Sequence, residues 1–281
     1  MKKIFSTIIS TILLFCVIIG SVGFFQADLT IDDMRKILIE KFVPESYLDG
    51  LPDERVESLY YDLRDEVTGF GGTNISTLNE TKDEPSIETK GSIPSDDMTF
   101  SVTKVFVYNN SSTKHIKEIQ IFVEYDWIHI PIWLKTDAVT VNWDSNVFTF
   151  KSGSFYSYSN NTGTYLSQFY ETNFELDNPT ILEQGGLGYD TELAYLLAHG
   201  QQPKPQNCFG RASFVLLPRV NPMYEKSTGN FLTTSINAQY RHNRNPFVGS
   251  VGFSIKGVSV NFDLSFLTDT TTQSTNIFYS N

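Results

Sequence analysis

The hydrophobic and polar positions change their period near residue 98, and this change predicts two structural regions. Up to about residue 68, apolar residues recur every three or four positions, which is typical of amphipathic helices. From residue 98 onward they alternate with polar residues, which is typical of half-buried strands. Residues 73–97 contain few large apolar side chains and therefore predict a polar linker between the two regions.

Residues 28–72 are expected to form a small acidic helical hairpin. Thr30 gives the first helix an N-terminal signal and Pro44 ends it, whereas the second helix opens at Pro52 and ends at the glycines of residues 69–72. Acidic residues outnumber basic residues by 12 to 5 over this range. Because two short helices bury little surface alone, we expect the hairpin to dock on the larger domain or on a partner. The apolar stripes are Ile31, Met34, Ile37, Leu38 and Phe42, then Val56, Leu59, Tyr60, Leu63 and Val67.

Residues 98–281 predict an antiparallel β-sandwich or barrel, because many short alternating segments are separated by turns. In the clearest strand, residues 118–127, apolar residues lie on one face and four polar residues on a face that is expected to meet solvent. Trp127 and Trp143 fall on apolar faces and are expected in the core. The four polar residues are Glu118, Gln120, Glu124 and Asp126, and further strands are expected at 99–108, 139–143, 148–150, 212–217, 231–240, 247–255 and 258–267.

Two local features interrupt the strand pattern. The alternation changes phase at Lys256-Gly257, which predicts a tight hairpin or a bulge. Residues 190–198 show helical spacing of their leucines after the glycine-rich stretch 185–188, so one helix is expected there.

Residues 1–27 predict a signal peptide or signal anchor. Lys2 and Lys3 precede an uncharged apolar run over residues 4–25, the arrangement of an export signal. Small residues before the end of the run favour cleavage after Gly23, whereas a retained run is long enough to span a bilayer. In either case the remainder is expected outside the cytoplasm, secreted or at the extracellular face of the cell membrane.

The composition and the net charge of the chain limit the kinds of partner that it can bind. Hydrophobic residues make up 40% of the chain, which supports a packed core, and the net charge of −11 repels phosphate backbones, so no nucleic-acid partner is expected. Cys208 is the only cysteine of the mature chain, because Cys16 lies in the apolar run. An intramolecular disulfide is therefore excluded, and Cys208 is expected to be a small buried hydrophobe. The short Lys-Lys signal and the single cysteine favour a Gram-positive bacterial source.

The sequence lacks the motifs that are typical of common catalytic sites. The four histidines lack zinc-ligand spacing, and the chain contains neither a GxSxG nucleophile elbow nor a phosphate-binding loop with its lysine. No catalytic residue, cofactor or metal site is therefore predicted. The carboxylates Glu124 and Asp126 share one strand face, and paired carboxylates of this kind can flank a glycosidic bond. A secreted hydrolase that acts on glycans is thus the alternative function.

Aromatic residues provide the candidate binding site. Rings that are exposed on a sheet stack against sugars or pack against protein partners. The stretch 151–173 is rich in Ser, Asn, Thr and Tyr and is expected to be exposed. We therefore predict a binding surface that includes Trp133, Tyr156, Tyr158 and Tyr165.

The C-terminal alternating segment supports a further alternative. Residues 250–267 place Ser and other polar residues on one face of a hairpin and apolar residues on the other. Membrane-inserting hairpins share this pattern with ordinary edge hairpins. A membrane-active competition factor is therefore a further candidate function.

Two groups of motifs resemble uncharacterised secreted β-rich proteins of Gram-positive bacteria. The first is YDWI at 125–128 with VNWD at 141–144, and the second is QYRH at 239–242 with VGSVGFS at 248–254. The resemblance implies export and a β-rich body over most of residues 98–281, and it carries no catalytic residue over. The sequence as a whole predicts an exported binding or interaction protein whose ligand is a glycan, an envelope polymer or another protein. A membrane contact is expected only through an uncleaved N-terminal segment.

Overall fold

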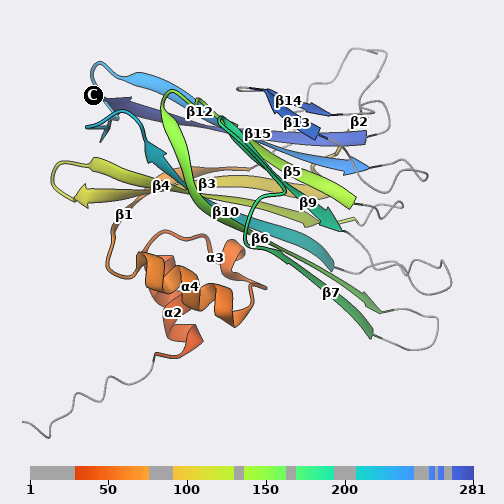
Figure 1. Cartoon of the computed structure of the whole chain (residues 1–281). Helices are drawn as coiled ribbons and strands as arrows, with labels where there is room; N and C mark the ends of the chain where they lie inside the picture. The colour runs from red at the N-terminus through yellow and green to blue at the C-terminus, as the bar shows by residue number, and fades with distance from the viewer. Residues whose placement is uncertain are drawn as a thin grey trace, which may run out of the picture.

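The computed structural model describes residues 29–75, 91–129, 136–162, 169–192, 207–243, 253–256, 259–262 and 268–281. The chain is mainly β. A large, mostly antiparallel sheet curls into a half-barrel, and a small helical segment precedes it in sequence and packs beside it (Figure 1). The predicted fold class, an antiparallel β-sandwich or barrel after a small helical region, is confirmed.

The helical segment consists of α2 (Ile31–Glu40), α3 (Glu45–Leu48) and α4 (Asp53–Leu63). Thr30 caps α2 in a capping box, in which its hydroxyl accepts from the Asp33 N–H and the Asp33 carboxylate accepts from the Thr30 N–H. Of the described helices, none has the length and hydropathy needed to cross a bilayer.

The second predicted helix, which corresponds to α4, is shorter than the spacing of its apolar residues predicts. It ends at Leu63, and Val67 together with the glycines after it belongs to the first strand, β1 (Val67–Ile75). β1 pairs with the next long strand through a bulge between Phe70 and Gly72. Tertiary pairing thus decides the conformation of residues 67–72, which the sequence pattern had assigned to the end of a helix.

The sheet has two halves that the short strand β11 (Tyr224–Glu225) joins by pairing with His115 of the first half and Ser280 of the second. The first half has the order β1, β3 (Met98–Asn110), β4 (His115–Trp127), β10 (Asn207–Pro218), β6 (Phe148–Thr162) and β7 (Phe169–Leu176). The second half has the order β8 (Ile181–Glu183), β9 (Gly186–Glu192), β5 (Thr136–Trp143), β12 (Leu232–Asn243) and β15 (Thr268–Ser280).

Two strands correct the sequence-based expectations, and one hairpin agrees with them. β2 (Gly91–Ser92) runs parallel to β15, so the predicted linker 73–97 contributes residues to β1 and β2. β9 covers residues 190–192, which corrects the predicted helix start there, while residues 193–198 lie outside the described residues. The hairpin of β13 (Phe253–Lys256) and β14 (Ser259–Phe262) confirms the predicted turn at Lys256-Gly257 and forms a two-stranded sheet of its own.

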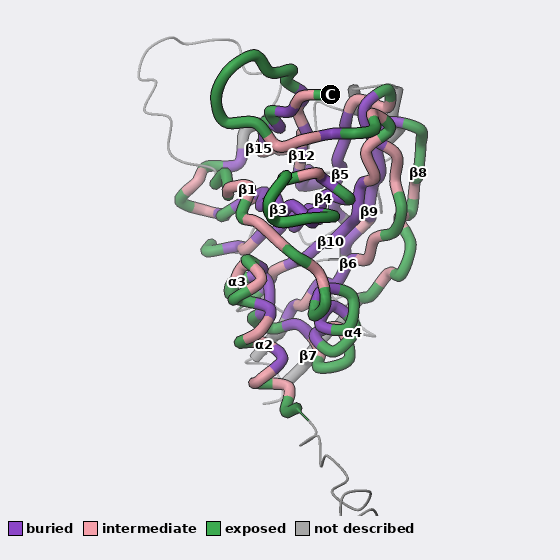
Figure 2. The backbone as a smooth tube through the Cα atoms, turned by 90° about the vertical axis from the view of Figure 1, so that its left-hand side faces the viewer, coloured by how far each residue is buried: buried purple, intermediate pink, exposed green. Residues whose placement is uncertain are grey.

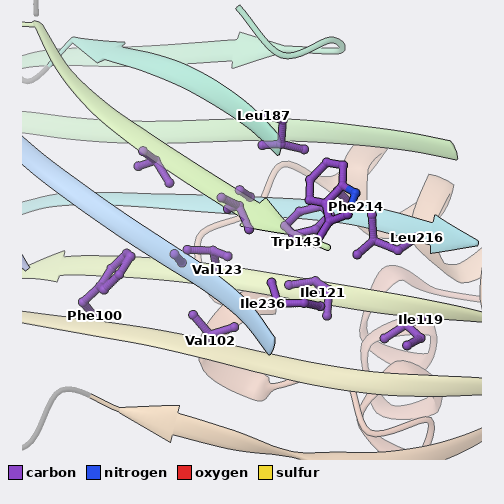
Figure 3. Close-up of a cluster of buried hydrophobic side chains, with 14 of the residues drawn as sticks. Phe100, Val102, Ile119, Ile121, Val123, Trp143, Leu187, Phe214, Leu216 and Ile236 are labelled. Carbon is purple, nitrogen blue, oxygen red and sulfur yellow. The ribbon is translucent and has the colours of Figure 1, made fainter. Parts of the chain in front are cut away.

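The main core fills the space inside the half-barrel. Apolar side chains from the inner faces of both halves meet there, among them Phe100, Ile121, Trp143 and Phe214 (Figure 3). Trp143 has no exposed surface and Trp127 is buried, which confirms that both belong to the core. This burial of apolar surface from distant strands is the main stabilisation of the sheet.

A second core lies on the outer face of the first half, where the helical segment docks. Apolar side chains of the helices, such as Leu38 and Val56, pack against Val105, Phe122 and Tyr156 of the sheet. Buried positions accordingly occur both on the strands and on the helical segment (Figure 2). The expectation that the helical region docks on the larger domain is confirmed.

The prediction that the polar face of β4 meets solvent is wrong, because the helical segment docks on this face. Glu118, Gln120 and Glu124 are only 6%, 4% and 6% exposed. The alternation along the strand indicated a polar face correctly, but the sheet neighbours and the helical segment cover that face. Asp126, at the end of the strand, stays partly exposed.

Arg211 of β10 connects the helical segment to this polar face. Its Nε donates to the Ser46 carbonyl oxygen at 3.1 Å, and its Nη1 donates to the Tyr125 carbonyl oxygen at 3.0 Å. Its Nη2 lies 2.9 Å from the Asp126 carboxylate, and Nε lies 3.6 Å from the Glu124 carboxylate. One buried guanidinium thus links α3, β4 and β10.

Replacing this guanidinium should weaken the folded state strongly. In Arg211→Met, Glu124 stays buried without its cation, and breaking a buried ion pair costs about 3–5 kcal/mol. We expect urea denaturation to show a loss of this size, and hydrogen exchange to show earlier opening of residues 45–48. The matched control is Arg219→Met, because Arg219 is exposed and makes a single 3.4 Å bond to the Phe148 carbonyl oxygen. Equal losses in the two variants would contradict the linking role of Arg211.

Candidate functional site

The candidate site is a cleft between the helical segment and the outer face of the sheet. It has a volume of about 190 Å³ and is lined by residues of α3, α4, β4, β6 and β10, together with Asp177 after β7. In Figure 1, the helical segment lies beneath β6 and β10, where this cleft forms. The lining is mostly polar, which distinguishes the cleft from the two apolar cores.

The sheet wall of the cleft follows from strand alternation. On β6, Phe155 points into the main core, so its neighbours Ser154 and Tyr156 lie on the opposite, cleft-facing side. From β4, the Gln120 amide donates to the Ser213 hydroxyl at 2.9 Å. The wall therefore presents hydroxyl and amide groups beside one aromatic ring.

The helix wall follows from the 3.6-residue period of α4. Arg55, Ser58, Leu59 and Asp62 line the cleft, and this spacing places them on one side of the helix. Leu59 belongs to the buried stripe that packs on the sheet, and the other three residues flank this stripe. The cleft thus opens along the border between the apolar and polar faces of α4.

Arg55 lines the cleft and pairs with two carboxylates. Its Nη2 lies 2.7 Å from the Asp177 carboxylate and 3.3 Å from the Glu175 carboxylate. Partial burial opposes the charge of Arg55, but the bonds and charges of Asp177 and Glu175 outweigh it and raise the pKa of the guanidinium. These ion pairs connect α4 to the end of β7, far away in sequence.

Asp62 lies on α4 seven residues after Arg55, and the causes that shift its pKa differ from those at Arg55. Asp62 is exposed, but desolvation by the surrounding protein raises the pKa of its carboxyl group, Lys151 lowers it, and the like charge of Glu118 adds to the rise. Lys151 is itself engaged, because its Nζ lies 2.6 Å from the Glu118 carboxylate. In the part of the chain that the structure describes, no cationic side chain forms an ion pair with Asp62.

The structure brings together two of the four predicted binding residues. Tyr156 is 5% exposed and lines the cleft, and Tyr158 is half-buried and stacks on Phe209 with ring centroids 5.2 Å apart. The Tyr156 ring also lies 6.2 Å from Phe209. Trp133 and Tyr165 lie outside the described residues. The two described tyrosines thus support the helical segment and do not form a broad exposed surface.

Sequence reasoning missed most of the polar cleft residues. Arg55, Ser58 and Asp62 carry a detectable signal, since their three- and four-residue spacing marks one flank of the second helix. Asp177 and Ser154 carry no comparable signal, because only the packing of α4 against the sheet places them at the cleft.

The carboxylates that suggested a hydrolase have a structural role. Glu124 and Asp126 both face the Arg211 guanidinium, at 3.6 and 2.9 Å. The Ser101 hydroxyl also donates to Glu124, at 3.2 Å. These contacts account for the pair as part of the link between the sheet and the helical segment.

A second polar cluster lies inside the half-barrel around the fully buried Asp137. Its carboxylate accepts from the Tyr240 hydroxyl at 2.5 Å and from the Asn243 N–H at 2.8 Å, and it lies 3.0 Å from His242 Nδ1. The Trp127 indole N–H donates to the Tyr240 hydroxyl at 3.0 Å. Because each carboxylate oxygen is bonded, this cluster fixes β4, β5 and β12 to one another.

Nucleophile and metal chemistry find no support in the described residues. Burial raises the pKa of the Cys208 thiol well above its ordinary value, which keeps it protonated and confirms a small buried hydrophobe. Within the described ranges, no three His, Cys, Asp or Glu side chains gather to hold a metal ion.

Comparisons with known proteins do not assign the chain: no family model matches it, and no curated protein matches its sequence. The function therefore has to be inferred from the cleft and from the sequence patterns.

Glu124 should give the folded state a specific pH dependence. Burial raises the pKa of its carboxyl group above the ordinary value of 4.5, although Arg211, Ser46 and Ser101 lower it in part. The folded chain therefore keeps this proton to a higher pH than the unfolded chain. As the pH rises from about 4.5 through the folded-state pKa, the free energy of unfolding contributed by Glu124 falls, and above that pKa it stays constant.

Glu124→Gln isolates this contribution, because the variant lacks the titrating group. Urea denaturation of both proteins over a pH series should show that the stability of the wild type relative to the variant decreases with rising pH. An increase with rising pH would show that attraction to Arg211 outweighs burial and would contradict the expected sign.

Proposed function

We propose that this protein is an exported binding protein of a Gram-positive bacterium, and that the cleft between α4 and the sheet holds its ligand. The observation that carries the proposal is the polar, concave lining of this cleft beside two well-packed apolar cores. Binding sites are typically concave, with a few polar groups that fix the orientation of the ligand.

The volume of the cleft limits what part of a ligand enters. A volume of 190 Å³ corresponds to about six water molecules. A terminal sugar or one side chain of a peptide is of this size, so the ligand is the end or a side group of a glycan, an envelope polymer or a protein. The Tyr156 ring and the hydroxyls of Ser58 and Ser154 suit such polar groups.

Binding fits the described carboxylates better than hydrolysis does. Hydrolysis of a glycosidic bond needs two carboxyl groups on opposite sides of the bond. Glu124 and Asp126 instead lie on the same face of one strand and share Arg211. The pair that suggested a hydrolase is therefore not arranged for hydrolysis, and recognition is the role that we propose for the cleft.

Export rests on residues 1–27 and on the resemblance to secreted β-rich proteins. Fractionation of the native culture, with mass spectrometry of the N-terminus, should find the protein outside the cytoplasm. We expect a soluble product that begins near Phe24 or Asp28, after removal of the apolar run. A full-length product in the membrane pellet would identify residues 4–25 as an anchor, and a cytoplasmic product would contradict export.

Filling the cleft should abolish binding to the envelope. The exported protein is mixed with the insoluble envelope fraction of the same culture and sedimented, and the bound fraction gives an apparent Kd. Ser154→Phe places a ring in the cleft and should weaken sedimentation at least tenfold. Thr272→Phe is the matched control, because Thr272 is exposed on β15 and lies outside the cleft. Thermal melting of each variant verifies its folding.

Two results would overturn this proposal. Sedimentation of Ser154→Phe at the wild-type level would remove the cleft from the binding site. Failure of the wild type to bind the envelope fraction would contradict an envelope ligand altogether.

A further inference from the structure

We propose that the cleft selects ligands that carry a primary ammonium group, and that Asp62 receives this group. The inference names the ligand class of the binding function proposed above and rests on it. It follows from the charge balance of the cleft and from the position of Asp62.

Of the four charged residues that line the cleft, Arg55, Arg211 and Asp177 each have an ion-pair partner among the described residues, and Asp62 has none. Each arginine faces two carboxylates: Arg55 faces Glu175 and Asp177, and Arg211 faces Glu124 and Asp126. Lys151 faces Glu118. The lining itself therefore carries two carboxylates, Asp62 and Asp177, and two guanidinium groups whose charges are offset by the carboxylates that they face.

The arrangement of the cations opposes an anionic ligand. Arg211 is 4% exposed, and its N–H groups already donate to protein oxygens. The Arg55 Nη2 group already faces Asp177 and Glu175, and their two charges offset the charge of the guanidinium. Because the whole chain carries a net charge of −11, long-range attraction also favours cations over anions.

Asp62 is the carboxylate that is positioned to meet an incoming cation. It follows Arg55 by seven residues on the same side of α4, which separates the two along the helix by about 10 Å. Lys151, the cation whose charge acts on Asp62, is held by Glu118. Within the described residues, the Asp62 carboxylate therefore has no ion-pair partner, although it lines the cleft.

An ammonium group fits this place better than a larger cation. It is compact and has three donors, whereas guanidinium is planar and larger. The Asp62 carboxylate and the neighbouring hydroxyls of Ser58, Ser152 and Ser154 supply acceptors in a cleft of 190 Å³. The neutral remainder of the ligand would then lie along the serines and Tyr156.

Matched pairs of probes test the inference and distinguish two sources of the amine. The first pair is the β-1,4-linked disaccharide of glucosamine and its N-acetylated form. The second pair is the tripeptide Gly-Lys-Gly with an acetylated N-terminus and the same peptide acetylated at Nε as well. Isothermal titration of the exported protein should show that at least one free amine binds tenfold or more tightly than its acetylated partner. Preference for the sugar or the peptide identifies the source.

Three substitutions assign the effect to Asp62. Asp62→Asn should reduce the affinity for the free amine to that of the acetylated probe. Lys151→Met should increase the affinity about threefold, because it removes the positive charge that acts on Asp62. Glu57→Gln is the matched control, since Glu57 is an exposed acid on α4 outside the cleft, and it should leave the affinity unchanged. Opposite changes in Asp62→Asn and Lys151→Met are not expected from a loss of structure.

Failure of this inference differs from failure of the binding function. Equal affinities for free and acetylated probes, or wild-type affinity in Asp62→Asn, would overturn the ammonium assignment. If Ser154→Phe still abolishes envelope binding in that case, the cleft remains the binding site for a neutral ligand. If the wild type binds neither the probes nor the envelope fraction, both proposals fall.

Discussion

The buried guanidinium of Arg211 is the interaction on which the relation between sheet and helical segment depends. It donates to the carbonyl oxygens of Ser46 and Tyr125 and lies beside the carboxylates of Glu124 and Asp126. Apolar contacts between the helices and the sheet provide most of the favourable burial, but they have little directional preference. Directional bonds to a fixed charge determine where the helices lie on the sheet.

The position of the helical segment creates the cleft. The apolar stripe of α4 seals against the outer face of the sheet, and the polar flank of the same helix forms the second wall. On the sheet side, alternation supplies serines and Tyr156, since their neighbours fill the main core. Docking of the helical segment therefore produces both a stabilising core and a polar cleft, and the pairs of Arg55 with Glu175 and Asp177 connect α4 to the end of β7.

Electrostatics connects this architecture to the proposed function. Both arginines at the cleft face two carboxylates each, so their charges are offset within the structure and Asp62 is the charged lining residue without an ion pair among the described residues. A structural role for Glu124 and Asp126 also removes the main support for a glycan hydrolase. Recognition of a small cationic group is the chemistry that the remaining carboxylate, Asp62, is suited to perform.

The sequence by itself determined the features that depend on local periodicity and local signals. These include the antiparallel β body, helices near Thr30 and Pro52, the hairpin at Lys256-Gly257 and the core position of Trp143. Alternation also identified the polar face of β4, but its burial depends on a helical segment that the strand pattern does not contain. The strand conformation of residues 67–72 and 190–192 depends on the tertiary structure, because long-range pairing overrides local propensity there. The tertiary structure alone brought Asp62, Ser154 and Asp177 to one cleft, since residues of different elements that lie far apart in sequence meet only through packing.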